Sequence, residues 1–460
     1  MTAAGILSNL AGIVGSANLI TDPAQLGIYG VGRTAPKAAM RLGSNQEVAE
    51  IVRLAAAEQL ALVPVGARTK LGMNIPLRGY DLALDMTRLD RVVAYDPDDL
   101  TMSVEAGIPL RKLSEVLAAH RQFLPLAVPF ADRTTVGGTI ASGVDPPLRQ
   151  FYGTARDYVL GMEFVIGDGR IVKSGGRVVK NVSGYDLHKL LIGSLGSLGV
   201  MTKINLRTFP APMSIRVFVA CFDSAQEAVG MRQRLAQSPL RPLTMEILSP
   251  LAAELLSGTV AARTEPGELP SDAFPRARWA VIVSYAGIEK VLGRYDRDLR
   301  QTAGAAEITT LGEEPTRIAL GRVREFVPIA LESSPATVII KMSVLPGRIS
   351  ELLEDAAVAA EKAGLSWAAI ARGVGVVYFA LLPEAKNDGA RSRVDNVIKD
   401  LADACGSRNG NITVPWLPDE WKSLAAPRNV HRTDLDLMRK LKNVFDPSGT
   451  FAPDPIASWK

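Results

Sequence analysis

The stretch from Thr134 to Gly143 reads TTVGGTIASG, and the interpretation of the whole sequence starts from it. A pair of glycines that leads into a run of small residues lets the backbone approach a flat or phosphorylated ligand closely. The same residues also suit tight packing of a helix against a sheet. This stretch alone therefore leaves a ligand site and a packing contact as alternatives.

Two further regions rich in small residues lie on either side of this stretch. The first, from Pro64 to Lys70, reads PVGARTK, and its backbone N–H groups and its Arg, Thr and Lys side chains suit a pyrophosphate. The second comprises KNVSGYDL from Lys180 and GSLGSLGV from Gly193. Because glycine is costly in chain entropy, such density indicates close approach of the backbone to another group. No Gly-x-Gly-x-x-Gly opens a helix after a strand, and no Walker pattern occurs.

The predicted elements of the first half come in a mixed order. Hydrophobic spacing predicts a helix over residues 45–60, capped by Ser44, and a second helix that begins at Pro109. Strands are predicted at residues 61–65, 82–85, 91–95, 101–105, 159–166, 170–173 and 200–209. This order favours an α+β fold over the strict alternation of a Rossmann domain.

The segment from Pro210 to Pro212 is the clearest linker in the sequence. Beyond it, predicted strands alternate with predicted helices: strands 215–221, 279–285, 337–342 and 376–382, and helices 224–236, 289–302, 349–362 and 392–404. This rhythm predicts an antiparallel sheet backed by helices, followed by a tail helix and a turn. We therefore expect an N-terminal extension, two domains and a C-terminal segment, at residues 1–35, 36–210, 211–426 and 427–460.

Composition argues against several classes of protein. Among 460 residues, 52 basic and 48 acidic side chains give a formal net charge of +4, so no basic face for a nucleic acid is expected. Two distant cysteines, Cys221 and Cys405, are too few for an iron–sulfur cluster, and we expect reduced thiols. The apolar N-terminus up to Ile20 lacks the basic start of a signal peptide and is too interrupted for a membrane span, so a helix is expected there.

The glycine-containing regions together, in this order and at these separations, resemble the FAD-binding domain of the vanillyl-alcohol oxidase-type, or PCMH-type, flavoproteins. More narrowly, they are similar to the FAD-binding subunits of bacterial glycolate oxidases. The matching region runs from about Met40 to Pro210, and the ending from Val444 to Pro453 resembles the family's C-terminal turn that folds back toward the flavin. The resemblance implies a two-subdomain FAD-binding domain followed by a cap domain with antiparallel sheet and helices.

The resemblance also implies which residues bind FAD, without a covalent bond. The loop after the first glycine would cradle the pyrophosphate, and the other stretches would line the flavin ring or the adenosine. These cofactor-binding residues are Pro64, Gly66, Ala67, Arg68, Thr69, Lys70, Thr135, Gly137, Gly138, Ser142, Gly143, Gly153, Asn181, Ser183, Gly184, Tyr185, Gly199 and Val200. No metal site is expected, because the region from Phe209 to Val430 lacks the histidines that related 2-hydroxy-acid dehydrogenases often use.

The sequence leaves the catalytic residues unassigned. Many catalytic relatives carry a glutamate where this chain has Leu195, which argues against catalysis by this chain alone. A base in the second domain could come from Glu246, Tyr285, Lys341 or Arg372, and nothing in the sequence ranks them. For His188, a satisfied helix histidine is favoured over a flavin contact.

These observations favour an FAD-linked oxidoreductase, namely an FAD-binding subunit of a multisubunit 2-hydroxy-acid (glycolate-like) oxidase or dehydrogenase. Its expected partners are a homologous flavoprotein subunit and an iron–sulfur subunit that receives the electrons. Its expected location is the cytoplasm, or the surface of the inner membrane through those partners. Two alternatives stay open: a non-catalytic scaffold with a degenerate flavin pocket, and a self-sufficient FAD-linked oxidase of another alcohol, such as a sugar or a phenol.

Overall fold

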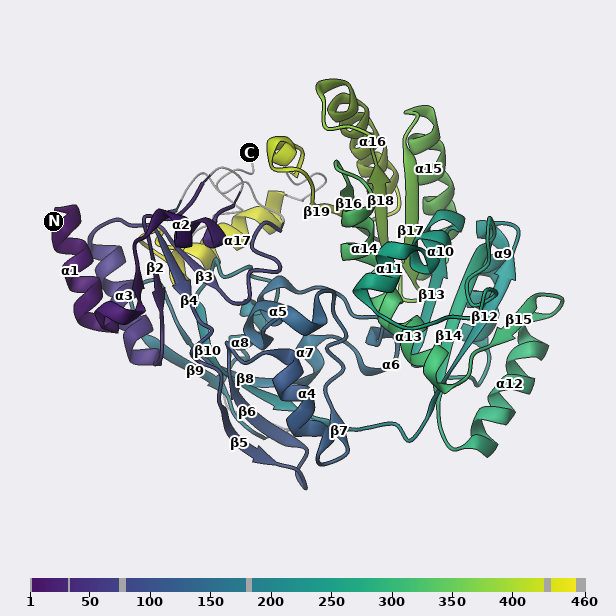
Figure 1. Ribbon diagram of the computed structural model, residues 1–460, viewed down its shortest axis with the longest axis horizontal. Helices are drawn as coiled ribbons and strands as arrows, with labels where there is room; N and C mark the ends of the chain where they lie inside the picture. The colour runs from purple at the N-terminus through teal and green to yellow at the C-terminus, as the bar shows by residue number, and fades with distance from the viewer. Residues whose placement is uncertain (1, 32–33, 74–79, 179–183, 426–431, 452–460) are drawn as a thin grey trace.

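The computed structural model describes residues 2–31, 34–73, 80–178, 184–425 and 432–451. Figure 1 shows two parts, one from the first half of the chain and one built around a large sheet from the second half. Among the short helices, α5 (Val136–Ser142) and α7 (Ala155–Tyr158) belong to the first part, whereas α6 (Arg149–Tyr152) approaches the large sheet. The last helix, α17 (Arg432–Phe445), returns to the first part.

The first part contains a four-stranded sheet in the order β1-β2-β4-β3, in which β2, β4 and β3 run parallel. Its strands are β1 (Leu19–Ile20), β2 (Ala38–Arg41), β3 (Leu62–Val65) and β4 (Leu82–Asp85). Two helices pack on it, α1 (Ala3–Val14) and α3 (Asn45–Ala57). Ser44 caps α3 as predicted, because its side chain accepts a hydrogen bond of 3.1 Å from the Glu47 amide.

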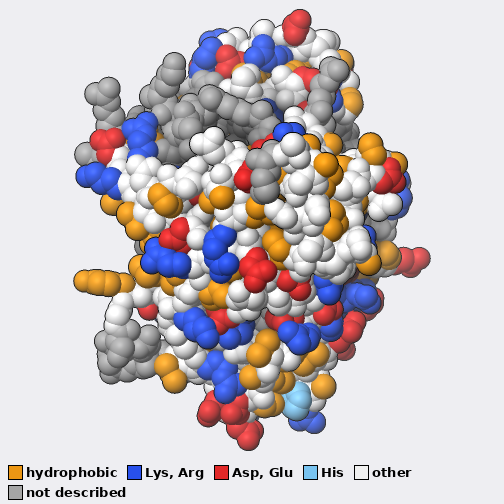
Figure 2. Space-filling model, turned by 90° about the vertical axis from the view of Figure 1, so that its left-hand side faces the viewer, with side chains coloured by type: hydrophobic (Ala, Val, Ile, Leu, Met, Phe, Trp, Pro, Cys, Tyr) orange, Lys and Arg blue, Asp and Glu red, His pale blue; other side chains and the backbone are white. Residues whose placement is uncertain are grey.

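The first part also contains an antiparallel five-stranded sheet in the order β5-β6-β10-β8-β9. Its strands are β5 (Val92–Asp96), β6 (Thr101–Glu105), β8 (Val159–Val165), β9 (Ile171–Gly175) and β10 (Val200–Arg207). Helices α4 (Leu110–Ala118) and α8 (His188–Leu191) lie in this part. Helix α4 begins one residue after the predicted start, because the backbone of Pro109 is still extended. Figure 2 views the first part from outside, and basic and acidic side chains are interspersed over the area coloured by type.

The second part is built on an antiparallel eight-stranded sheet in the order β15-β12-β14-β13-β17-β18-β16-β19. Its strands are β12 (Ile215–Phe222), β13 (Thr244–Leu248), β14 (Trp279–Ala286), β15 (Glu307–Thr310), β16 (Val338–Ser343), β17 (Ser366–Arg372), β18 (Val376–Leu382) and β19 (Asn411–Trp416). The predicted sheet is confirmed, and β18 has the predicted bounds. The structure adds β13, β15, β17 and β19, which the sequence pattern did not reveal.

Helices cover both faces of the large sheet. The outer face carries α9 (Ala225–Gln237), α12 (Glu289–Ala303), α15 (Ile349–Lys362) and α16 (Asp388–Gly406). The inner face carries α10 (Pro250–Ser257), α11 (Thr259–Thr264), α13 (Glu313–Arg324) and α14 (Phe326–Ser333), and its hydrophobic core continues into the first part through α5 and β8. The α+β fold class is thus confirmed, and the inner face of the large sheet faces the first part.

Candidate functional site

A pocket lies in the first part, between β3, the loop after it and α5. Three segments that are distant in the sequence form its wall. Its lining residues are Val63, Pro64, Val65, Gly66, Ala67, Arg68, Thr69, Lys70, Leu71, Met73, Thr134, Thr135, Gly138, Ala141, Ser142 and Leu195. We call these residues the glycine pocket.

The absence of a side chain at Gly66 lets the loop after β3 approach α5. An added Cβ at Gly66 would lie 2.3 Å from Thr135 Oγ1, closer than nonbonded atoms approach. Thr135 caps α5, because its hydroxyl accepts from the Gly138 amide at 3.2 Å. Among the described residues, no acceptor pairs with the backbone N–H groups of residues 66–70. The loop therefore presents consecutive unpaired donors beside the pocket, as an anionic ligand requires.

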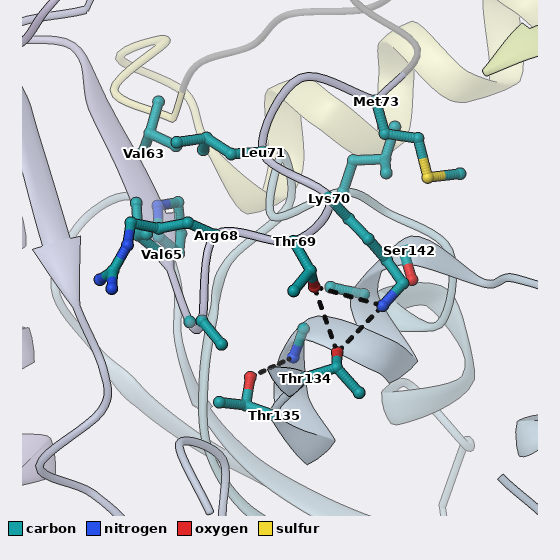
Figure 3. Close-up of a pocket in the computed structure, with 16 residues that line it drawn as sticks. Val63, Val65, Arg68, Thr69, Lys70, Leu71, Met73, Thr134, Thr135 and Ser142 are labelled. Atoms are coloured by element: carbon teal, nitrogen blue, oxygen red, sulfur yellow. Dashed lines mark hydrogen bonds between the residues drawn. The ribbon is translucent and has the colours of Figure 1, made fainter. Parts of the chain in front are cut away.

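Two cationic side chains leave this loop on opposite sides (Figure 3). Lys70 Nζ donates to Thr134 Oγ1 at 2.9 Å and lies 5.7 Å from the centre of the Phe130 ring. Burial lowers the pKa of Lys70 to about 8, although Glu325 raises it in part. Arg68, by contrast, lies 3.6 Å from Asp85 and over the ring of Tyr29. Lys70 is thus a half-buried cation for which a phosphate would be a natural counter-ion.

The glycine pocket fits the pyrophosphate of a dinucleotide. Unpaired backbone donors and a half-buried ammonium group together stabilise phosphate oxygens. Glycine is required at position 66 because any Cβ there would collide with Thr135. Nine of the residues that the sequence suggested line this pocket: Pro64, Gly66, Ala67, Arg68, Thr69, Lys70, Thr135, Gly138 and Ser142. Their binding of FAD stays a prediction.

Seven of the suggested residues do not line the pocket, for identifiable reasons. Gly137 packs against Ala106, Gly143 against Gly193, and Gly199 against Val165, where an added Cβ would come within 2.8–2.9 Å of those neighbours. Val200 is buried in the strand pair of β10 and β8. The remaining three are a turn glycine beside Asp157 and two exposed residues, namely Gly153, Gly184 and Tyr185. Asn181 and Ser183 lie outside the described residues.

The sequence did not suggest several residues of the pocket wall. Leu195 reaches it from the glycine-rich loop before β10, in a backbone conformation with φ of 55°. Its amide donates to Ala141 O at 2.8 Å, so this loop packs along α5. Thr134, Ala141 and Met73 also line the pocket. Proximity to the glycine stretches was the only available signal for them.

A second group of polar residues lies on the inner face of the large sheet. Side chains on a strand alternate between faces, and register places Glu246 opposite Arg372, and Lys341 opposite Tyr378. Arg372 Nη1 contacts Glu246 Oε1 at 2.8 Å, with both side chains fully buried. Tyr285, another candidate base, instead belongs to the outer-face core and stacks on Tyr295.

These residues meet the segment that follows α5. Lys341 Nζ lies 2.5 Å from Asp145 Oδ2, and Arg149 pairs with the other carboxylate oxygen. Burial opposes ionisation of Asp145, but Lys341 and Arg149 outweigh it and hold the pKa of Asp145 below its usual value. We call Asp145, Arg149, Glu246, Lys341 and Arg372 the central charge cluster.

His188 does not reach the glycine pocket. Its ring is buried, and Nδ1 lies 3.0 Å from Ser174 Oγ on β9. Within the described ranges, no three His, Cys, Asp or Glu side chains gather as a group that could hold a metal ion. Nor does any helix among the residues described combine the length and the apolar character needed to cross a membrane.

Family models match most of the chain. Residues 36–175 match the FAD binding domain, and residues 211–456, more than half of the 460 residues, match the C-terminal domain of FAD linked oxidases. The chain belongs to the FAD-linked oxidases. FAD is accordingly its cofactor, and this FAD-linked oxidase is an oxidoreductase, as the sequence predicted.

Individual relatives agree with the family. Glycolate oxidase subunit GlcD of Bacillus subtilis is 22% identical, with 91% of this chain and 88% of the relative covered. Glycolate oxidase subunit GlcE of Escherichia coli is 35% identical over 43% of this chain and 55% of its own. D-lactate dehydrogenase of Archaeoglobus fulgidus is 27% identical, with 92% and 93% covered.

Solved structures confirm the predicted PCMH-type fold. p-Cresol methylhydroxylase superimposes with a TM-score of 0.77 at 17% identity, covering 99% of this FAD-linked oxidase and 97% of the other chain. 4-Ethylphenol oxidase from Gulosibacter chungangensis gives 0.74 at 17% identity, covering 100% and 98%. At such low identity, these likenesses show the fold alone.

Proposed function

We propose that this chain is the FAD-binding subunit of a multisubunit oxidase or dehydrogenase for small 2-hydroxy acids such as glycolate, and that it passes electrons to a partner subunit in the cytoplasm. The relatives support this class, because they include glycolate oxidase subunits and D-lactate dehydrogenases. FAD would occupy the glycine pocket without a covalent bond, its pyrophosphate held by the amides of residues 66–70 and by Lys70.

The single observation that carries the substrate class is the central charge cluster. It contains three cations and two carboxylates, a net charge of plus one, in a largely buried position. Asp145 follows pocket residue Ser142 by three positions, so their Cα atoms are at most about 11 Å apart. A monoanionic hydroxy acid beside the pocket would balance this charge.

The side chains of this protein would bind and orient the substrate and would not themselves react with it. Lys341 and Arg372 would hold the substrate carboxylate from the inner face of the sheet. Tyr378 supports Arg372 from the neighbouring strand, with its ring centre 5.3 Å from the guanidinium carbon. The chemistry that FAD would supply when bound is acceptance of the hydrogen at carbon 2 together with the two electrons of its C–H bond, while the hydroxyl proton is released and a 2-oxo acid forms. Because electrons must then leave and the two cysteines are distant, an iron–sulfur subunit is the proposed acceptor.

The visible absorbance spectrum of the purified chain tests this function. We expect about one FAD per chain, bleaching of the flavin band by anaerobic glycolate or D-lactate, and slow turnover until partner subunits are added. Fast turnover by the chain alone would contradict the subunit role. A Lys341→Met variant should keep FAD but need a much higher acid concentration for bleaching, and the matched change of an exposed lysine, Lys37→Met, should not.

A second candidate is a scaffold subunit that binds FAD without reducing it. It is favoured by the internal pairing of Lys341 with Asp145 and of Arg372 with Glu246, since both cations already have carboxylate partners. A yellow protein whose flavin stays unbleached by every 2-hydroxy acid tested would support the scaffold and contradict the substrate assignment.

A further inference from the structure

The end of the described chain is anchored inside the first part by one buried lysine. Lys442, on α17, is 6% exposed and donates to Asp446 Oδ2 at 2.6 Å, to Ser197 O at 2.8 Å and to Phe451 O at 3.0 Å. Its three partners lie in the turn after α17, in the glycine-rich loop before β10 and at the last described residue. A single ammonium group thus joins three segments.

Asp446 organises the turn after α17 from the other side. Its two carboxylate oxygens accept from the amides of Thr450 and Phe451, each at 2.8 Å. Gly167 lies against it, and an added Cβ there would come 2.3 Å from Asp446 Oδ1. The carboxylate therefore keeps two backbone donors even without the lysine, so the turn does not depend on Lys442 alone.

Both ends of this arrangement lead to the walls of the glycine pocket. Thr450 O accepts from the Leu62 amide at 2.7 Å, and Phe451 bridges to Leu62, which begins β3. β3 continues directly into the Gly66 loop. On the other side, Ser197 lies two residues after Leu195, which lines the pocket. The two walls touch between these points, where an added Cβ at Gly196 would lie 3.2 Å from Pro64.

We propose that Lys442 and Asp446 form a C-terminal clamp that positions two walls of the FAD site relative to each other, with Lys442 as a positioning residue for FAD binding. The clamp touches no ligand; it fixes the distance between β3 and the Leu195 loop. The proposal rests on the assignment of the glycine pocket to FAD made above. It extends that assignment to a segment more than 240 positions away from Ser197.

The test compares two methionine variants of buried cations. Arg322 on α13 is the matched control, because it is 3% exposed and also donates to two backbone carbonyls, Leu256 O at 3.0 Å and Gly267 O at 2.9 Å, but in the second part. The full-length apoprotein is titrated with FAD. Loss of Lys442 should raise the FAD dissociation constant about tenfold, because part of the binding free energy must then be spent on positioning the two walls. Lys442→Met should also change the visible circular dichroism of the flavin at saturation, whereas Arg322→Met should change neither.

The outcomes separate the clamp from the site itself. If Lys442→Met and Arg322→Met lower the unfolding midpoint alike and both bind FAD as the wild type does, Lys442 is merely structural and the proposal is wrong. Gly66→Ala serves as the reference for the site. If Gly66→Ala loses FAD binding and Lys442→Met binds FAD normally, the clamp proposal is wrong but the assignment of the pocket to FAD stands. Normal binding by Gly66→Ala would instead overturn the assignment of the pocket.

Hydrogen exchange of the wild-type protein supplies an independent measurement that needs no variant to fold. FAD should slow amide exchange in residues 442–451 as well as in residues 62–70, because the clamp couples them. Protection of residues 62–70 without any in 442–451 would contradict the proposal.

Discussion

The glycine pocket and the central charge cluster differ in whether their cations have carboxylate partners within the protein. In the pocket, the half-buried Lys70 donates to a threonine hydroxyl, and neighbouring backbone donors lack acceptors among the described residues. In the cluster, the half-buried Lys341 and the buried Arg372 contact carboxylates at 2.5 and 2.8 Å. The first arrangement has no carboxylate on its cation, whereas in the second two carboxylates offset two of the three cations and leave one positive charge for a substrate anion.

The difference teaches where ligand binding and stability reside. A cation and backbone donors without an anionic partner contribute little to folding and much to the affinity for an anionic ligand. An ion pair already formed within the protein, such as Arg372 with Glu246, instead helps to hold two strands in register. Substitutions in the two regions should therefore affect different measurements, and three of them test that contrast.

The largest effect is expected at Gly66. Gly66→Ala should weaken FAD binding by about a hundredfold, because its Cβ would displace Thr135 from 2.3 Å and overpacking of this kind costs on the order of 1–3 kcal/mol. Fluorescence titration with FAD measures it. The same change at Gly293, on α12 with nothing within 4 Å of an added Cβ, should leave affinity intact and raise the free energy of unfolding slightly. Equal FAD affinities of Gly66→Ala and Gly293→Ala would contradict the role of the glycine pocket in binding.

The next effect is a loss of stability in the charge cluster. Arg372→Met should lower the free energy of unfolding by about 3–5 kcal/mol, because it leaves the fully buried Glu246 carboxylate without its cation. Urea denaturation measures the change. The double variant Arg372→Met with Glu246→Leu should recover most of it, since no uncompensated charge remains. If Arg372→Met is as stable as the wild type, Arg372 and Glu246 do not form the buried ion pair described.

The smallest effect is a pH dependence of FAD affinity. Burial lowers the pKa of Lys70 to about 8, so the ammonium group that would face the pyrophosphate is lost as pH rises through that value. FAD affinity should fall from pH 7 to pH 9, by at most about tenfold per pH unit for one titrating group. The free energy of unfolding of the apoprotein should change in the opposite direction with pH. The folded state holds fewer protons on Lys70 than the unfolded chain does, so the apoprotein becomes more stable between pH 8 and the usual lysine pKa. Lys70→Met should bind FAD more weakly with a flat profile, and a wild-type profile without slope would contradict the role of Lys70.

The sequence predicted the pocket better than the cluster, for a physical reason. A glycine in the sequence indicates a close approach of the backbone to another group, so Gly66 and Gly138 could be predicted as pocket residues before the fold was known. The same signal cannot distinguish a ligand from a neighbouring strand, which is why Gly137 and Gly199 turn out to pack against protein backbone. Thr134 and Leu195, in contrast, were not among the predicted FAD-binding residues, although both lie in the glycine-containing stretches.

The cluster required strand register, which the sequence did not supply. β13 reads TMEIL and β17 reads SWAAIAR, patterns with a charged residue inside or few β-branched residues, and neither strand was predicted. Without these two strands, Glu246 and Arg372 could not be recognised as cross-strand neighbours. The four candidate bases therefore stayed unranked until the structure separated Tyr285 from the rest.

The bond between Lys442 and Ser197 has a consequence for biosynthesis. The two residues are 245 positions apart, so a ribosome that adds about 5–20 residues per second exposes the second one roughly 12–50 s after the first. During that interval the emerging polypeptide has its glycine loops but not the segment that fastens them. Cofactor loading would then follow translation rather than accompany it, and a nascent chain stalled before residue 442 would emerge colourless.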